Sequence, residues 1–465
     1  MFLKNKYFFE NFLNFFQKSL HFLGKILTIV VKYLLGGNFM KNSIKLLSVI
    51  LLFALALSVV SCAASKAPGG HYGDGYMGAM PEGDTSTEPD VNEEDKQPQL
   101  PAGMITAGAW NDNENYEMWV NLFMQGDTEI DRNNGKFLRY ASAGKNWGFN
   151  SLKRVKVNVA CDGKAVAGAE VVANGDDGAV LFKAVSDAQG NAYLFTNAES
   201  GSITVTSGEG SATAEFSAEK RELTLELEAS AEKLNVIELM FVVDVTGSMG
   251  DELSFLKAEL GDIINKIAAN DAQTQIKLAF LFYRDNGDSV PFKFCDFVEI
   301  TDESGLNKVL GTLKTQSASG GGDYEEAVDE ALEMAVNAQW STGATTKLIF
   351  HVLDAPAHSG SKYETRFNQA VVKAAEQGIR ISPILCSGAA EITEYTMRQA
   401  AIYTGGTFIF VTDDSGIGGE HHDPGLPNAT VELLNSMLVR LIKGYHTGVF
   451  DEPIYWQDDP ALAQK

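Results

Sequence analysis

The sequence predicts a multi-domain chain, in which a doubly wound α/β domain over residues 233–445 follows a small all-β sandwich over residues 152–230. In the C-terminal region, apolar runs alternate with amphipathic helical stretches, which indicates parallel strands buried on both faces. In the preceding region, short runs alternate strictly between apolar and polar residues and are separated by Gly, Asn and Asp turns. That pattern is typical of strands with one buried face.

The α/β prediction assigns each apolar run to a strand and each amphipathic stretch to a helix. The expected strands are Ile237–Val243, Ile276–Tyr283, Lys347–Leu353, Ile379–Leu385 and Thr407–Val411, with an edge strand at Lys293–Ile300. The expected helices are Met249–Ala269, Ser304–Leu313, Glu325–Ala338, Arg366–Gln377, Thr393–Tyr403 and Val431–Lys443. This alternation predicts an open sheet whose ligand crevice lies at the carboxyl ends of its strands.

The β-sandwich prediction rests on about seven short strands. Alternation is strict over residues 155–159 and 223–227, and turns such as Asp162-Gly163 separate the runs. The stretches DGKAVAGAEV (residues 162–171) and SDAQGNAYLF (residues 186–195) resemble the carboxypeptidase regulatory-like, or transthyretin-like, domain. That resemblance implies a spacer or binding module without peptidase activity.

The chain is strongly acidic. Its 465 residues carry a formal net charge of −24, and residues 1–61 contain seven Lys and one Glu, which leaves −30 for the remainder. Such a surface repels nucleic acid and anionic membrane surfaces, so we expect no nucleic-acid partner.

The N-terminal region reads as an export signal. After Met40, Lys41 and Lys45 precede an apolar run over residues 46–60, and Ser61-Cys62 follows. This layout predicts a signal peptide over residues 40–61. The small residue before the cysteine resembles the bacterial lipobox, which implies a lipid on Cys62 and a protein anchored to a membrane of the cell envelope, at the outer membrane or cell surface. The alternative is a transmembrane anchor, for which the run is short compared with about 20 residues.

The remaining segments are assigned by composition. We expect translation to begin at Met40, so that residues 1–39 are not part of the protein; the alternative is a membrane-surface extension. Residues 62–100, rich in Gly, Pro, Glu, Asp, Ser and Thr, predict a solvated tether. Residues 101–150 form an aromatic-rich connecting segment with a short helix near Asn115–Met124, and residues 446–465 a C-terminal tail.

Four cysteines, Cys62, Cys161, Cys295 and Cys386, are too few for a disulfide scaffold. With Cys62 lipidated, the other three form either one pair and one thiol or three buried thiols, and we favour three thiols.

Three segments far apart in the sequence place oxygen-bearing side chains at the expected crevice. They are Asp244-Val245-Thr246-Gly247-Ser248 after the first strand, Gly320-Gly321-Gly322-Asp323-Tyr324-Glu325-Glu326 before a helix, and Asp354-Ala355-Pro356-Ala357-His358 after a further strand. Carboxylate and hydroxyl oxygens suit a hard divalent cation, with Mg²⁺ favoured and Mn²⁺ or Ca²⁺ as alternatives.

The DVTGS segment resembles the Asp-x-Ser/Thr-x-Ser signature of the metal-ion-dependent adhesion site of von Willebrand factor A domains. The resemblance covers roughly residues 233–445. It implies that Thr246 and Ser248 ligate the metal through their hydroxyls, and that Asp244 and Asp354 hold it directly or through water. It also implies an open coordination position for an acidic residue of a protein ligand.

The second loop departs from that family, because Asp323 stands where a threonine is usual. We include Asp323 among the metal-binding residues, and its extra carboxylate puts in doubt how strongly the metal attracts an external acid. We interpret Glu326 as either a second-shell base or a helix-start acid. We expect Arg284 to pair with Asp285 or a site carboxylate, His358 to lie on the site rim with metal ligation as the alternative, and His421-His422-Asp423 to be solvated.

These observations favour a lipid-anchored envelope protein that engages a protein partner through the metal. The second hypothesis is a structural component of an envelope assembly, with the metal as a clamp on three loops. The third is a metal-assisted hydrolase using Asp244, Asp323, Asp354 and His358. We expect no enzyme, because the sequence shows no nucleophile paired with a base.

Overall fold

The computed structural model describes residues 104–124, 134–142, 144–270, 273–343, 345–415, 419–427 and 429–464. All of them belong to one unit of the chain. The expected signal peptide, the residues before it, Cys62 and the tether up to residue 100 lie outside this part. Within it, no helix combines the length and the apolar character needed to cross a membrane.

An eight-stranded sheet forms the centre of the α/β domain, with the strand order β12-β11-β10-β13-β14-β15-β1-β16. Strands β10, β11, β13, β14 and β15 are parallel, whereas β12 and β1 run antiparallel to their neighbours. The strands are β1 (Thr106–Trp110), β10 (Val236–Asp244), β11 (Gln275–Tyr283), β12 (Phe292–Glu299), β13 (Thr346–Leu353), β14 (Ile379–Leu385), β15 (Phe408–Val411) and β16 (Glu432–Leu433). The predicted doubly wound α/β fold is confirmed.

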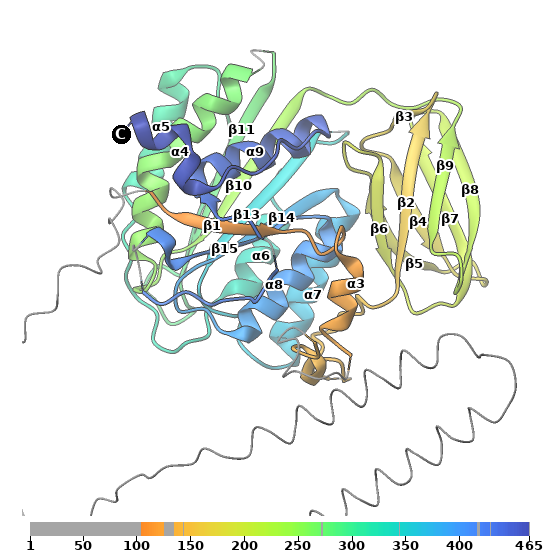
Figure 1. Cartoon of the computed structure of the whole chain (residues 1–465), viewed down its shortest axis with the longest axis horizontal. Helices are drawn as coiled ribbons and strands as arrows, with labels where there is room; N and C mark the ends of the chain where they lie inside the picture. Colours follow the sequence, from red (N-terminus) through yellow and green to blue (C-terminus); the bar gives the residue numbers. More distant parts are fainter. Residues whose placement is uncertain are drawn as a thin grey trace, which may run out of the picture. The chain divides into compact units, whose positions relative to one another are not determined.

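Six helices cover the two faces of this sheet (Figure 1). Helices α4 (Gly250–Asn270), α5 (Glu303–Lys314) and α9 (Leu434–Thr447) share one apolar core with one face, and α6 (Val328–Val336), α7 (Ser361–Glu376) and α8 (Glu391–Thr404) share a second core with the other face. Every residue of β13 and β14 is buried, as expected for strands of a sheet that is covered on both faces.

Helices α6, α7 and α9 begin at least three residues from their predicted starts. Helix α9 begins at Leu434 and not at Val431, because Glu432–Leu433 forms β16 beside β1. Helix α7 starts at Ser361 and not at Arg366. The prediction missed its first turn because the helix has no buried residue before Phe367. Helix α6 starts at Val328 and not at Glu325, because the backbone of Glu326 pairs with Ala357 and its N–H donates to the Pro356 carbonyl at 3.0 Å. The later start of α6 changes the environment of Glu326.

The all-β part consists of two four-stranded sheets. One contains β2 (Arg154–Cys161), β3 (Lys164–Ala165), β6 (Asn191–Phe195) and β9 (Glu222–Leu227); the other contains β4 (Glu170–Asn174), β5 (Val180–Val185), β7 (Ser200–Ser207) and β8 (Gly210–Ser217). Val155, Val157 and Val159 are fully buried between the sheets, as their alternation predicts. The predicted sandwich is confirmed as a fold.

The sandwich and the α/β domain share a continuous apolar core, although the sequence divides them into two domains. The ring of Phe195 stacks on Tyr403 of α8, with centroids 4.4 Å apart and planes at 12°. A Cβ atom at Gly378 would lie 2.9 Å from Val185 of β5, and Gly378 also has a φ of +68°. Glycine at this position therefore permits the close approach of the two parts.

Residues 104–142 do more than connect the tether to the sandwich. Thr106–Trp110 forms β1, which lies between β15 and β16, and α3 (Tyr116–Asn121) follows. The sequence TAGAW has no β-branched alternation, so its periodicity does not predict a strand. Its small residues have a steric role, because a Cβ at Gly108 would lie 2.3 Å from the ring of Phe410.

Two other expectations concern the C-terminus and the cysteines. The segment after α9 is ordered by packing, since Trp456 is buried against Met104 and Leu433. Cys161, Cys295 and Cys386 are free thiols, as predicted, but only Cys386 is buried, and Cys161 and Cys295 are half-buried.

Candidate functional site

Two aspartates meet at the carboxyl edge of the central sheet. Asp244 is the last residue of β10, and Asp354 directly follows β13. These strands are adjacent and in parallel register, with Val243 opposite Val352. Both aspartates are at least 96% buried, so the fold places two carboxylates from distant segments in one poorly solvated position.

The carboxylate of Asp244 is only half satisfied. Its Oδ1 accepts hydrogen bonds from the Thr246 backbone N–H at 2.8 Å and from the Thr246 hydroxyl at 2.7 Å. Its Oδ2 is buried and has no partner among the described residues. Burial, together with the charge of Asp354, raises the pKa of Asp244 to about 7 despite the two hydrogen bonds.

Asp354 is stabilised by the other hydroxyl of the DVTGS segment. The Ser248 side chain donates a hydrogen bond to Asp354 and thereby lowers its pKa, but burial outweighs this and the pKa of Asp354 is raised overall. The segment thus supplies one hydroxyl to each aspartate. Carboxylates flanked by hydroxyls are the donor chemistry that the sequence analysis expects for a hard cation.

Glu326 joins these aspartates, although sequence reasoning left its role open. It is 4% exposed, and its Oε2 has no partner among the described residues. Burial and the charges of Asp244, Asp285, Asp288 and Asp354 raise the pKa of Glu326 to about 9. The reading of Glu326 as a helix-start acid is wrong, because α6 begins two residues later.

The glycine loop explains how Glu326 reaches this position. Gly321 has a φ of +76°, and a Cβ atom there would lie 2.7 Å from Glu326 Oε1 and 3.4 Å from the Thr246 side chain. A larger residue would therefore displace Glu326 or Thr246. The run of three glycines is the feature of the sequence that could have indicated a close approach between this loop and the first one.

Asp323 is exposed, unlike Asp244, Asp354 and Glu326. Its charge is one of those that raise the pKa of His358. His358 Nε2 lies 2.7 Å from Asp285 Oδ1, and its Nδ1 lies 3.7 Å from Glu325. Burial lowers the pKa of His358, but Asp285, Asp323 and Glu325 outweigh burial and raise it. His358 is therefore an ion-paired residue of the site rim.

The loops around the site are joined directly. Gly247 N–H donates to the Gly320 carbonyl at 3.3 Å, and the Tyr324 hydroxyl accepts from the Ala390 N–H at 2.8 Å. Arg284 donates to the carbonyl oxygens of Ser319 at 2.7 Å and Ser317 at 2.9 Å. The expected pairing of Arg284 with a carboxylate is not found among the described residues, because its guanidinium supports the backbone before the glycines.

The interpretation of His421-His422-Asp423 as solvated is wrong for both histidines. His422 Nε2 lies 2.6 Å from Glu394 Oε2, and His421 Nδ1 lies 2.6 Å from Asp413 Oδ1. The His421 side chain is 4% exposed. The partner of His422 is on α8 and that of His421 follows β15, and neither is one of the site carboxylates.

A divalent cation fits the residues at the sheet edge. Among the described residues, no group of three or more His, Cys, Asp or Glu side chains converges for a metal, so a cation here also needs hydroxyl donors. Thr246 and Ser248 provide them. A bound cation would also stabilise the buried oxygens of Asp244 and Glu326 that have no hydrogen-bond partner among the described residues. Asp244 and Asp354 with these hydroxyls would hold the ion, which would neutralise the buried acids.

Comparison with known protein families identifies the domain that carries these loops. The model of the von Willebrand factor A domain matches residues 238–413. These residues form a von Willebrand factor A domain. The match begins in β10 and ends just after β15, so it contains all three loops of the site.

A curated protein and two solved structures are similar to part of this chain. An ariadne-like RING finger protein of Acanthamoeba polyphaga mimivirus is 31% identical over 140 residues, which are 29% of this chain and 13% of that protein. The structure of BatB from Bacteroides thetaiotaomicron is similar over 37% of this chain and 87% of its own, with 16% identity and a TM-score of 0.28. The pilus adhesin SpaC from Lactobacillus rhamnosus GG is similar over 53% and 32%, with 10% identity and a TM-score of 0.33.

Proposed function

We propose that the von Willebrand factor A domain binds one divalent cation at the sheet edge and uses it to capture an acidic residue of a protein partner. The observation that carries this proposal is the pair of buried, unpartnered carboxylate oxygens beside the Thr246 and Ser248 hydroxyls. Neutral hydroxyl ligands leave a cation incompletely neutralised, so it attracts a further carboxylate. We propose Mg²⁺ as the ion, with Mn²⁺ or Ca²⁺ as alternatives.

The proposal predicts stabilisation of the full-length chain by the metal. At a Mg²⁺ concentration a hundredfold above the dissociation constant, the free energy of unfolding should rise by about 2.7 kcal/mol. Asp244→Asn should abolish this gain, and its metal-free stability should equal or exceed that of the wild type, because a buried charge is removed. Thermal unfolding with Mg²⁺ and with EDTA measures both effects.

Asp323→Asn is the matched control, since it removes the same charge from an exposed loop position. It should keep most of the stabilisation by Mg²⁺. The site assignment fails if the wild type gains nothing from any of the three ions, or if Asp323→Asn loses as much as Asp244→Asn.

Partner capture separates adhesion from a purely structural metal. Immobilised wild-type chain should retain proteins from an envelope extract in Mg²⁺ and release them in EDTA, and Asp244→Asn should not retain them. Retention that ignores both EDTA and the substitution would support a structural component. The direct hydrogen bonds between the loops argue against a clamp, because the loops are already joined without a metal.

We also propose that the chain is not an enzyme and that the carboxypeptidase regulatory-like sandwich acts as a spacer.

We further propose that the chain is a lipoprotein of the cell envelope, attached through Cys62. The apolar run ending in Ser61-Cys62 supports this proposal. Cys62→Ser should therefore move the exported protein from the membrane fraction to the soluble fraction, or leave its signal peptide uncleaved. Cell fractionation followed by mass spectrometry of the N-terminus distinguishes these outcomes. A variant that stays fully membrane-bound after cleavage would show that the anchor is elsewhere.

A further inference from the structure

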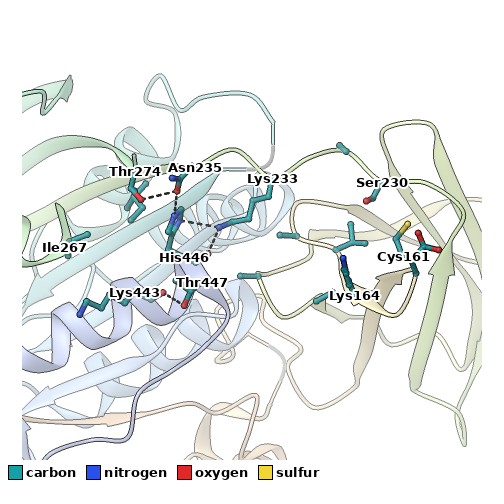
Figure 2. Close-up of a pocket in the computed structure, with 17 residues that line it drawn as sticks. Cys161, Lys164, Ser230, Lys233, Asn235, Ile267, Thr274, Lys443, His446 and Thr447 are labelled. Atoms are coloured by element: carbon teal, nitrogen blue, oxygen red, sulfur yellow. Dashed lines mark hydrogen bonds between the residues drawn. The ribbon is translucent and has the colours of Figure 1, made fainter. Parts of the chain in front are cut away.

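A cavity lies at the opposite edge of the central sheet from the proposed metal site. Its volume is about 730 Å³, and it is bordered by the start of β10, the end of α9, the first hairpin of the sandwich and the linker between the two domains (Figure 2). Asn235 and Ile237 line it, whereas Asp244 ends the same strand. At about 3.3 Å per residue, the two sites are more than 20 Å apart along β10.

The walls of this cavity carry an excess of positive charge. Lys164 comes from the sandwich, Lys233 from the linker and Lys443 from α9, and Asp162 is the one acidic residue in the described lining. None of the three lysines forms an ion pair with any part of the chain that the structure describes. In a chain with a net charge of −24, three lysines facing one cavity without acidic partners are a specific feature.

Lys233 is held in place by a hydrogen-bonded network (Figure 2). Its ammonium group donates to the backbone carbonyl of His446 and lies 3.3 Å from His446 Nδ1. His446 Nε2 lies 2.7 Å from Asn235 Oδ1, which also accepts from the Thr274 hydroxyl at 3.1 Å. His446 Nδ1 also lies 2.9 Å from the Thr346 hydroxyl, so the ring is held at both nitrogens. The charge of Lys233 is thus fixed by donors and acceptors that do not neutralise it.

The electrostatic environment of Lys233 also favours an anion. Burial lowers the pKa of Lys233, and the positive charge of Arg380 lowers it further, with no carboxylate to offset them. A negative group in the cavity would oppose both effects.

The rest of the lining is mainly apolar and selects the body of the ligand. It comprises Ala165, Val166, Ala167, Ala188, Ala231, Ile237 and Ile267. Figure 2 shows Lys164 and Lys443 on opposite sides of Lys233, so positive charge is offered at separate places along the cavity and favours a ligand with more than one anionic group. The volume lies within the range of about 300–1,000 Å³ that is usual for small-molecule sites.

We propose that this cavity binds a small organic dianion, with an apolar middle and two separated carboxylate or phosphate groups. Such a ligand would contact the sandwich, the linker and the von Willebrand factor A domain at once. This inference does not depend on the proposed metal function, since no residue is shared between the two sites.

Calorimetric titration of the full-length chain in lipid nanodiscs with a matched set of ligands tests the proposal. Suberate has two carboxylates on an eight-carbon chain, octanoate has one, and 1,8-octanediol has none. Suberate should bind at least tenfold more tightly than octanoate, and the diol should not bind. Octane-1,8-diphosphonate distinguishes the two anion types, since the tighter of the two dianions identifies the preferred group. All titrations contain EDTA, so that the metal site cannot contribute.

The variants decide whether the lysines of the cavity are responsible. Lys164→Met/Lys443→Met removes two charges that make no side-chain hydrogen bond to described residues, and it should weaken dianion binding at least tenfold. Lys308→Met/Lys314→Met removes two exposed lysines of α5 and should leave binding unchanged. The proposal is overturned if neither dianion binds the wild type more tightly than the diol, or if the two double variants weaken binding equally.

Discussion

Replacing Arg398 with methionine should lower the free energy of unfolding by about 3–5 kcal/mol, because it leaves the buried Asp112 without a positive partner among the described residues and takes one cation from the buried Glu394, which keeps Lys136 and His422. Arg398 is 1% exposed and donates to Asp112 at 2.5 and 2.9 Å and to Glu394 at 2.9 Å. Its guanidinium also lies 5.3 Å from the centroid of the Trp119 ring. Burial already raises the pKa of Asp112 despite Arg398, so loss of this cation would be costly.

Arg139→Met is the control for this prediction. Arg139 pairs at 2.7 Å with Glu391 of α8, the helix that also contains Arg398, but the Arg139 side chain is 61% exposed. An exposed pair contributes at most about 1 kcal/mol. Urea unfolding of both variants measures the loss in free energy of unfolding. Equal losses would show that the contacts of Arg398 with Asp112 and Glu394 do not hold residues 104–124 to α8.

The second large effect concerns the segment that contains β1. A chain comprising residues 151–464 should lose cooperative unfolding of the von Willebrand factor A domain, whereas residues 104–464 should unfold like the full-length protein. Without residues 104–150, β15 and β16 lose the strand between them, and Arg398 and Glu394 lose Asp112 and Lys136. Trp119 and Phe137, both fully buried, would also be missing.

The expected size follows from these buried side chains. Removing a single large aromatic side chain from a core costs about 3–5 kcal/mol, and a domain has a net stability of only about 5–15 kcal/mol. Circular dichroism in increasing urea measures the outcome. If residues 151–464 showed the unfolding midpoint of residues 104–464, β1 would be dispensable, and the fold would correspond to residues 233–445 as the sequence alone suggests.

The prediction of the fold succeeded where the signal is local. The continuous apolar run of β15 reflects burial on two faces, and the alternation of Val155, Val157 and Val159 reflects burial on one. Each pattern can be read within a single segment. The same holds for Asp244 and Asp354, because a strand end followed by an acid places that acid at the sheet edge whatever the neighbouring segments do.

Prediction was less successful where the environment depends on distant segments. Glu326 and Asp323 lie three residues apart in one acidic loop, and composition cannot tell which is buried. The backbone pairing of Glu326 with Ala357 decides it, and Asp323 remains exposed beside His358. His422 likewise has a Gly/Pro-rich local context but a buried partner, Glu394, on α8.

The sequence by itself therefore determined the two folded parts, the order of their main elements and the edge at which the candidate metal centre lies, since these follow from periodicity along the chain. Only the tertiary structure decided that β1 completes the sheet, that Glu326 joins Asp244 and Asp354, and that three lysines from three elements line one cavity. The physical reason is the same in each case. Steric fit at Gly108, burial of a carboxylate and accumulation of charge depend on residues brought together from distant parts of the chain.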